Sequence, residues 1–209
     1  TDGAAAHAWR ALGAGVVDVT TQVFVNPYAE CTPIIPEARF VSETWFRIGE
    51  YHFDDYVDTF AVDKSIAAYN VILRDPEDRN YGLALYKVAW AYYRANRFEQ
   101  AVRHFGMLVQ WSDDQMAATG RAGSDLRPEA MQYLGITFAY GDWNDNMVPD
   151  LEEGGQSGFQ RLQNQALLPQ DREWTPDVYF ATGEVFYEEA KYADAIQIWQ
   201  YALGRWPNH

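Results

Sequence analysis

The chain has 209 residues, of which 48% are hydrophobic and 16% aromatic, so it is long enough to bury a sizeable core. Its formal net charge of −14 disfavours nucleic acids and anionic lipid surfaces as partners, because an acidic surface repels phosphate groups. No apolar run approaches the roughly 20 residues that span a bilayer, and the single cysteine, Cys31, excludes an intrachain disulfide.

The first 35 residues differ in pattern from the rest of the chain. Residues 4–12 are rich in helix formers and residues 16–25 in β-branched side chains, so we expect a degenerate helix pair that packs on the helices that follow. A short strand is the alternative. Cys31 is expected to be a small buried hydrophobic residue. Because the chain begins at Thr1 rather than at Met, we expect it to be a processed or trimmed piece of a longer protein.

From residue 37 onward, small and aromatic residues recur at fixed offsets. The first set predicts two helices joined by a turn, with the second helix ending at Asp75-Pro76; its members are Trp45, Ile48, Gly49, Ser65, Tyr69 and Ile72. A small residue such as Gly49 lets two helices approach closely, while an aromatic side chain fills the space between them. The set therefore predicts a packed helix pair.

The same offsets return in two later sets. One contains Val88, Ala89, Tyr92, Ala101, Phe105 and Leu108, and the other contains Tyr179, Gly183, Phe186, Ala195, Trp199, Ala202 and Pro207. Ala101 and Ala195 are 94 residues apart, the difference between their numbers, and the same shift relates the other shared members. Two further helix pairs are predicted. Because no helix with a polar outer face follows Pro207, we expect another chain or a further repeat to cover this end.

A third set lies between these two and is only half matched. Met131, Leu134, Gly135 and Phe138 predict its first helix, and an insertion over residues 141–158 displaces the partner helix. Two helix starts are also predicted here. Ser112 is expected to cap a helix. Thr175 is expected to be the N-cap of the first helix of the last predicted pair, ahead of Pro176.

These offsets resemble those of the tetratricopeptide repeat family over residues 36–209. The resemblance implies an all-α fold, a right-handed superhelical solenoid of antiparallel helix pairs, with three to four repeats at about residues 37–76, 80–111, 127–168 and 175–207. Residues 46–53 and 85–94 further resemble cell-envelope proteins of this family from myxobacteria and their relatives. That narrower likeness implies a bacterial envelope assembly, periplasmic or associated with the outer membrane, with the cytoplasm as the alternative.

The resemblance also implies where a partner binds. In this family the first helix of each repeat lines the concave face, and the matching positions here form an aromatic groove with acidic spots, suited to a basic or apolar peptide. These positions are Phe46, Glu50, Phe53, Tyr86, Trp90, Tyr93, Arg94, Gln132, Ile136, Tyr140, Phe180, Glu184 and Tyr187. The alternative is that curvature or an added helix fills the groove. The sequence leaves two alternatives for assembly, a homo-oligomer and a hetero-oligomer. Because the family's carboxylate clamp uses Lys and Asn at such positions, a chaperone-tail adaptor is disfavoured.

The insertion contains a pattern of oxygen-bearing side chains that is typical of a calcium loop. Asp142, Asn144, Asn146, Asp150 and Glu153 stand at positions 1, 3, 5, 9 and 12, and Ca²⁺ prefers oxygen ligands. The departure is Met147 at position 6, where Gly normally permits the sharp turn, so we expect the backbone to follow a different path. The alternative is a solvated acidic insertion. A calcium-stabilised structural module is thus the second hypothesis.

The pattern of reactive residues argues against an enzyme. His7, His52, His104 and His209 are scattered without metal-ligand spacing, and Glu184, Glu188 and Glu189 need no role beyond solvation. We find no nucleophile elbow, phosphate loop or zinc pattern. The sequence therefore predicts a non-enzymatic protein-interaction scaffold, and a docking domain of a larger enzyme is a weaker alternative.

Overall fold

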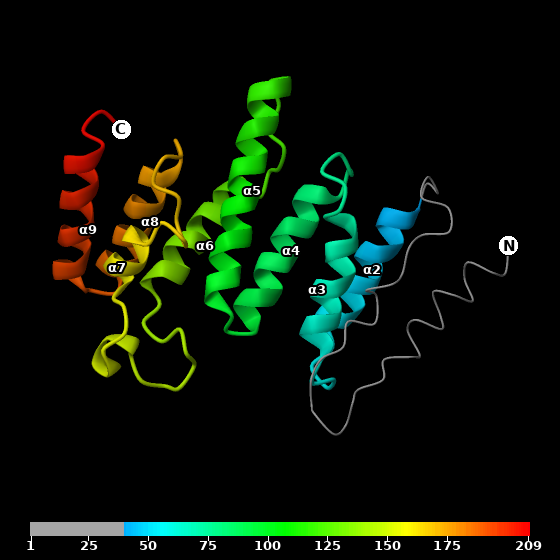
Figure 1. Cartoon of the computed structure of the whole chain (residues 1–209), viewed down its shortest axis with the longest axis horizontal. Helices are drawn as coiled ribbons and strands as arrows, with labels where there is room; N and C mark the ends of the chain where they lie inside the picture. Colours follow the sequence, from blue (N-terminus) through cyan, green and yellow to red (C-terminus); the bar gives the residue numbers. More distant parts are fainter. Residues whose placement is uncertain (1–39) are drawn as a thin grey trace, which may run out of the picture. The chain divides into compact units, whose positions relative to one another are not determined.

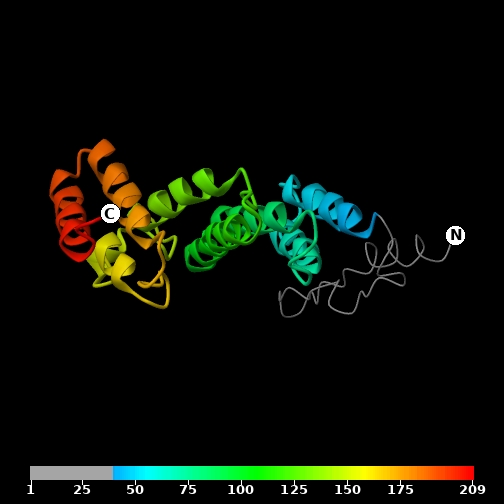
Figure 2. The ribbon, with the colours of Figure 1, turned by 90° about the horizontal axis from the view of Figure 1, so that it is seen from above.

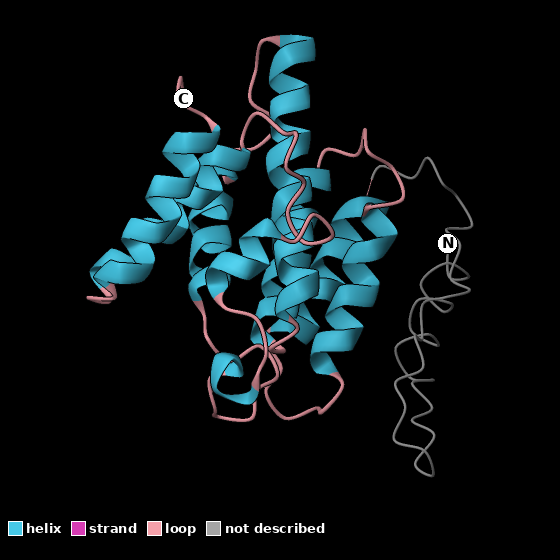
Figure 3. Cartoon of the chain, turned by 60° about the vertical axis from the view of Figure 1, so that its left-hand side comes forward, coloured by secondary structure: helices cyan, strands magenta, loops and turns pink. Residues whose placement is uncertain are grey.

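The structure, a computed structural model, describes residues 40–209, and every regular element among them is a helix (Figures 1 and 3). This confirms the expected all-α class for these residues. No described helix is both long and apolar enough to cross a membrane. The expectations for residues 1–35, including Cys31, lie outside the described residues. The helices are α2 Val41–Phe53, α3 Ala61–Ile72, α4 Tyr81–Arg94, α5 Phe98–Thr119, α6 Arg127–Ala139, η1 Asp150–Glu153, α7 Gly158–Gln163, α8 Thr175–Glu188 and α9 Tyr192–Arg205.

The chain forms two compact units, which we describe separately. Unit 1 ends at Ala91 and unit 2 runs from Tyr92 to His209, so the boundary lies inside α4. In unit 1, α2 packs against α3. Tyr69 is fully buried there, with its ring 5.5 Å from that of Phe46, and a Cβ added at Gly49 would collide with the Tyr69 ring. The predicted pairing of a small residue with an aromatic one therefore holds α2 and α3 together.

In unit 2, α8 and α9 lie side by side in both views and repeat this relationship (Figures 1 and 2). A Cβ at Gly183 would collide with the indole of Trp199, which lies across the helix pair. Gly135 lets α6 approach α8 just as closely, because a Cβ there would lie 2.9 Å from the backbone of Ala181. The small residues predicted at these positions thus mark the helix contacts.

The turn between α4 and α5 and the turn between α8 and α9 have the same backbone conformation. Asn96 and Ala190, which are 94 residues apart, both adopt left-handed φ values, of 55° and 60°. In each turn the next residue donates its N–H to a carbonyl five residues back, from Arg97 to Tyr92 at 2.9 Å and from Lys191 to Phe186 at 2.8 Å. The 94-residue shift therefore relates backbone geometry as well as side chains.

Helix α5 continues beyond the point at which we expected a new cap. Ser112 does not cap a helix; it is buried inside α5, where its hydroxyl accepts the N–H of Ser124 at 3.3 Å. The helix ends at Gly120, which has a left-handed φ of 71°, and the chain then returns along it. Arg127 secures this return through two hydrogen bonds to Asp113, at 2.5 and 2.9 Å. Tertiary packing thus outweighs the local capping preference of Ser112.

The expectation that Thr175 is the N-cap of α8 is also wrong. Thr175 lies inside α8, and its hydroxyl donates to the carbonyl of Pro169 at 2.6 Å instead of capping the helix. Trp174 takes the N-cap position, and its buried indole donates to Gln110 of α5 at 3.0 Å. The start of α8 is therefore fixed by a tryptophan anchored on another helix, which local capping rules do not anticipate.

Candidate functional site

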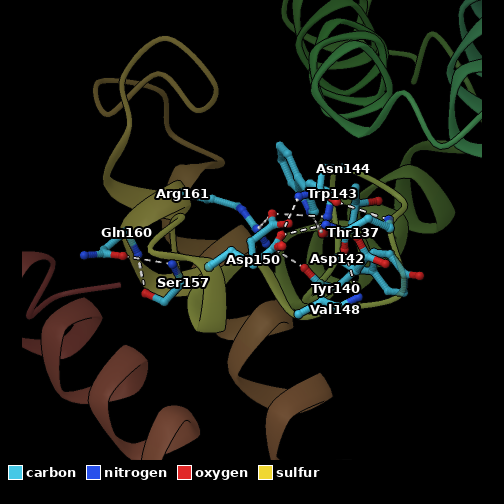
Figure 4. A network of polar contacts seen from close by, with 12 residues as sticks. Thr137, Tyr140, Asp142, Trp143, Asn144, Val148, Asp150, Ser157, Gln160 and Arg161 are labelled. Atoms are coloured by element: carbon cyan, nitrogen blue, oxygen red, sulfur yellow. Dashed lines mark hydrogen bonds and ion pairs between the residues drawn. The ribbon is translucent and has the colours of Figure 1, made fainter.

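The inserted loop between α6 and α7 is anchored on one buried ion pair (Figure 4). Arg161 of α7 pairs with Asp150 through a very short contact, and its side chain is only 3% exposed. The guanidinium also donates to the carbonyl of Tyr140 at 2.6 Å and lies over the Trp143 ring, 4.5 Å from its centre. Burial lowers the pKa of Arg161, whereas the adjacent Asp150 opposes this shift. One cation therefore holds both ends of the loop.

Local hydrogen bonds position Arg161 beside Asp150. Ser157 and Gln160 form a reciprocal capping box at the start of α7, with distances of 2.8 and 3.2 Å. On the loop side, the indole of Trp143 donates to the carbonyl of Thr137 at 3.0 Å, and its backbone N–H donates to Asp150 at 3.2 Å. The short helix and the loop are thus each fixed by hydrogen bonds of their own, in addition to the ion pair that joins them.

The outer part of the loop gathers the predicted calcium ligands. Asp142 accepts the N–H groups of Asn146 and Met147, at 3.2 and 2.7 Å, so the loop folds around its first carboxylate. The side-chain amides of Asn144 and Asn146 both donate to Glu153, at 3.1 and 2.7 Å. Four of the five predicted ligands, all except Asp150, therefore belong to one hydrogen-bonded cluster.

Two features of this loop bear on metal binding. Met147 itself adopts a left-handed φ of 67°, the conformation that Gly usually supplies, while our expectation of a different backbone path for the loop stays a prediction. Asp150, by contrast, is engaged with Arg161 and Trp143. Among residues 40–209, no group of three His, Cys, Asp or Glu side chains is placed to hold a metal ion. Any cation here would have to rely on the asparagine oxygens.

An open pocket of about 750 Å³ lies where this loop meets the start of α5. Phe98 and Trp143 form its aromatic wall, with ring centres 6.1 Å apart. Its polar lining includes Arg97, Glu99 and Glu153. Because apolar and charged side chains meet in one hollow, the pocket can receive the side chain of a protein segment.

Predicted partner-binding residues of unit 2 adjoin this pocket. The ring of Phe98 lies 5.5 Å from Tyr93 and 4.9 Å from Tyr140. Tyr93 is half-buried, which raises the pKa of its hydroxyl, whereas Tyr140 is exposed. The structure thus brings Tyr93 and Tyr140 to one aromatic cluster. Of the remaining predicted positions, Arg94 and Ile136 are partly buried and Gln132 is exposed.

The partner-binding residues predicted for the fourth repeat lie on α8, far in sequence from Tyr93, Phe98 and Tyr140. Glu184 and Tyr187 are exposed, and Phe180 stacks on His209 with ring centres 5.9 Å apart. Tyr187 contacts the rings of Tyr192 and Trp199 on α9, at 5.3 and 5.9 Å. These residues belong to the surface of the last helix pair.

In unit 1 the predicted positions have mixed environments. Phe46 is buried against Tyr69, so its ring fills space between α2 and α3. Glu50 pairs with Lys87 at 2.6 Å, and the Lys87 ammonium lies 5.1 Å from the centre of the Phe53 ring. Tyr86 and Trp90 are partly exposed and form an edge-to-face pair at 6.2 Å. Within unit 1, Tyr86 and Trp90 therefore retain accessible aromatic surface.

Sequence reasoning missed two residues of the site. Phe98 has the periodicity of a core residue and is buried, and only the fold reveals that it lines a pocket. Arg161 is a single arginine whose partner, Asp150, is 11 residues away across a loop. The capping box of Ser157 and Gln160 was the one local signal that a short helix starts there.

Part of the chain matches a known family of repeats. The tetratricopeptide repeat family model matches residues 83–110, which cover most of α4 and the first half of α5. This supports a tetratricopeptide repeat at that helix pair, and the all-helical structure is consistent with a repeat solenoid of this kind. Such repeats generally mediate protein–protein interactions. No curated protein matches the chain.

Proposed function

We propose that the chain is a non-enzymatic scaffold that binds a protein partner and that the pocket in unit 2 is a binding point. The observation that carries this proposal is the open pocket beside Phe98 and Trp143, next to Tyr93 and Tyr140. The resemblance to this repeat family assigns both tyrosines to ligand-facing positions, Tyr93 on α4 and Tyr140 directly after α6. Aromatic side chains bury large areas at low entropic cost, which suits them to binding.

The charges around the pocket indicate the chemistry of the partner. Glu153 is exposed at the rim, while Glu99 pairs with Arg103 at 2.7 Å. The net charge of −14 adds an acidic field over the whole chain. An extended segment that inserts an apolar or aromatic side chain beside Phe98, and places Lys or Arg near Glu153, fits these features.

The test is capture of the partner with the whole chain, followed by affinity measurements on variants. We expect Tyr140→Ala and Glu153→Gln each to weaken binding by about tenfold, as for residues central to an interface. Matched controls are Tyr51→Ala and Glu152→Gln, because both side chains are exposed and neither lines the pocket or, unlike Tyr140, contacts the ring of Phe98. A partner that binds all four variants equally would refute the use of this pocket.

The aromatic pair of unit 1 is tested separately. We propose that Tyr86 and Trp90 add contact area for the same or another protein segment, since both remain partly exposed. Trp90→Ala should then reduce affinity for a captured partner, measured well below the melting temperature of the variant so that the chain is folded. Unchanged affinity would confine recognition to unit 2.

The setting of this scaffold is also a proposal. The resemblance of residues 46–53 and 85–94 to envelope proteins supports an assembly in the bacterial envelope, in the periplasm or at the outer membrane. Fractionation of the producing cells, followed by detection of the native chain, tests this. Recovery with cytoplasmic markers alone would overturn it.

Calcium binding by residues 142–153 is the second candidate function. It is favoured by the cluster of Asp142, Asn144, Asn146 and Glu153, and by Met147, which adopts the left-handed φ that Gly usually supplies at this position. If the amides of Asn144 and Asn146 rotate by half a turn, their oxygens replace their nitrogens beside Glu153. A cation would then take the place of the two N–H donors.

Calorimetric titration with Ca²⁺, alongside a thermal melt, decides this candidate. Saturable heat and a raised melting temperature, both lost in the double variant Asp142→Ala/Glu153→Ala, would support a calcium-stabilised module. Glu152→Ala is the control for a neighbouring exposed carboxylate. No heat and no shift would leave a solvated acidic loop.

A further inference from the structure

The insertion between α6 and α7 exposes a short apolar segment. Met147 and Leu151 are 94% and 62% exposed, and Pro149 between them is exposed as well. Asp150, in contrast, turns its side chain inward to the ion pair with Arg161 (Figure 4). Single exposed apolar residues are ordinary, but three within five positions of one loop indicate a surface that another molecule contacts.

Hydrogen bonds hold this apolar segment in one conformation. At its start, the N–H of Met147 donates to the carboxylate of Asp142 at 2.7 Å. Toward its end, the N–H of Asp150 donates to the carbonyl of Gly141 at 2.9 Å, and the carbonyl of Asp150 accepts the N–H of Gly155 at 2.7 Å. A loop that is ordered before it binds loses little conformational freedom on binding. The segment is therefore preorganised.

The backbone of Met147 is strained, and the contacts of its side chain do not offset this strain. Four residues other than Gly have a left-handed φ among residues 40–209. Asn96 and Ala190 lie in the turns of helix pairs, and Asp145 is of a type that tolerates this conformation, whereas methionine is not. Because the Met147 side chain is almost fully exposed, little packing stabilises it. Strained residues concentrate at functional sites, so this one indicates a use for the exposed methionine.

The charge of the insertion specifies the chemistry of the partner. Residues 141–158 contain five carboxylates and no Lys, Arg or His, and no such residue occurs between Arg127 and Arg161. Arg161 is buried on Asp150, and the exposed Asp145 forms no ion pair within residues 40–209. This charge disfavours an anionic membrane and a second copy of the chain, whose net charge is −14. A basic protein surface is attracted instead.

We infer that Met147, Pro149 and Leu151 bind a basic amphipathic helix of a protein partner. Such a helix presents an apolar stripe flanked by Lys and Arg, which complements apolar side chains set among carboxylates. The flexible thioether of Met147 can adapt to that stripe. None of the three residues lines the pocket at Phe98 and Trp143, so the inference goes beyond the proposed function and is tested independently of it.

The probe is a fluorescent amphipathic peptide of Leu and Lys, about 14 residues or four helical turns long, with Leu on one face. Its binding to the whole chain is followed by fluorescence anisotropy at about 0.15 M salt, which screens long-range attraction to the net charge. EDTA is present so that calcium does not contribute. We expect saturable binding, weakened at least about tenfold by Met147→Ala and by Leu151→Ala. A peptide with Glu in place of every Lys should not bind at ~1 mM.

Met147→Gly separates docking from structure, because glycine adopts the left-handed φ without strain. We expect this variant to bind the peptide at least about tenfold more weakly than the native chain, although it melts at a temperature at least as high. Met116→Ala is the matched control. Met116 is 48% exposed and lies in the last turn of α5, 18 residues after Phe98 at the pocket, which is about 27 Å along the helix. Its loss should leave binding unchanged.

Several results would overturn the inference. The Lys peptide fails to bind at ~1 mM, or it binds Met147→Ala, Met147→Gly and Met116→Ala equally, which would mean attraction to the acidic surface as a whole. Binding that is lost in Tyr140→Ala and kept in Met147→Ala would assign the peptide to the pocket instead. Self-association of the native chain in sedimentation, abolished by Met147→Ala, would make a second copy the occupant. Binding to phosphatidylcholine vesicles that Leu151→Ala abolishes would make it a lipid surface.

Discussion

Arg161 and Asp150 form an ion pair that is almost completely shielded from water, with side chains 3% and 12% exposed. The pair joins α7 to the inserted loop, and the other oxygen of Asp150, Oδ1, is buried without a hydrogen-bond partner among the described residues. A buried charge without its counter-ion is strongly unfavourable. The ion pair therefore supports the pocket wall at Trp143, because Trp143 lies beneath the same guanidinium and donates its backbone N–H to the same carboxylate.

We predict that Arg161→Met destabilises the chain by ~3–5 kcal/mol, since it leaves the Asp150 carboxylate buried and unpaired. Urea unfolding measures the change. The double variant Arg161→Met/Asp150→Asn should lose less than the sum of the single variants, because it removes the orphaned charge.

Arg103→Met is the comparison for the ion-pair prediction. Arg103 and Glu99 also form an ion pair, at 2.7 Å, but both side chains are about half exposed. Its loss should cost no more than ~1 kcal/mol. If Arg161→Met costs no more than Arg103→Met, the loop is held by other contacts.

A second prediction concerns the two close helix contacts. Gly49→Ala and Gly183→Ala should each destabilise the chain by ~1–3 kcal/mol, because the added methyl group collides with the rings of Tyr69 and Trp199. Thermal and urea unfolding measure the loss. Gly204→Ala in α9 is the matched control: nothing lies within 4 Å of the added Cβ, so alanine should stabilise the helix by up to ~1 kcal/mol. Equal effects at Gly49, Gly183 and Gly204 would contradict the close-packing explanation.

These glycines also explain why the fold was predictable from the sequence. Gly49 and Tyr69, like Gly183 and Trp199, belong to neighbouring helices joined by short turns, so their contact follows from offsets along the chain. The start of α8 was not predictable, because Trp174 finds its partner Gln110 sixty-four residues away. Capping rules consider only hydrogen bonds between a side chain and the backbone close to it in sequence. Here a distant contact decides the helix boundary.

The candidate site was predicted only in part for the same reason. The spacing of Asp142, Asn144 and Asn146 shows in the sequence and was found. The anchoring by Arg161 depends on how α7 folds back onto the loop, which no periodicity encodes. Phe98 presented only the pattern of a core residue, and its place beside Trp143 is a result of tertiary structure.

A third prediction tests the left-handed residue of the loop. Met147 has a φ of 67° and a side chain that is almost fully exposed, so its conformation is strained and its contacts are few. Met147→Gly should stabilise the chain by up to ~1 kcal/mol, because glycine adopts this φ without steric cost.

Met147→Ala separates backbone strain from side-chain loss. Alanine keeps the strained φ, so the free energy of unfolding should stay within ~0.5 kcal/mol of the native value, as for exposed surface changes. If alanine and glycine stabilise the chain equally, the exposed methionine side chain, rather than the backbone, is the unfavourable element.

The last prediction concerns pH and His104, whose imidazole Nδ1 lies 2.8 Å from the carbonyl of Gln100 and whose ring lies 5.0 Å from that of Tyr92. Burial lowers the pKa of His104 below its usual value of 6.5; Arg103 adds to this shift and the hydrogen bond to Gln100 opposes it. The unfolded chain therefore takes up a proton at higher pH than the folded chain does. It follows that this histidine costs no stability above about pH 6.5 and destabilises the fold as the pH falls below that value.

Urea unfolding at about pH 8 and about pH 5.5 measures this dependence in the native chain and in His104→Gln, which cannot take up the proton. Carboxylates elsewhere also change stability with pH, but they are common to both proteins and cancel in the comparison. We expect the native chain to lose more stability between the two pH values than His104→Gln does. An equal loss would mean that His104 is protonated in the folded chain as readily as in the unfolded one, and that its packing against Tyr92 leaves it open to water.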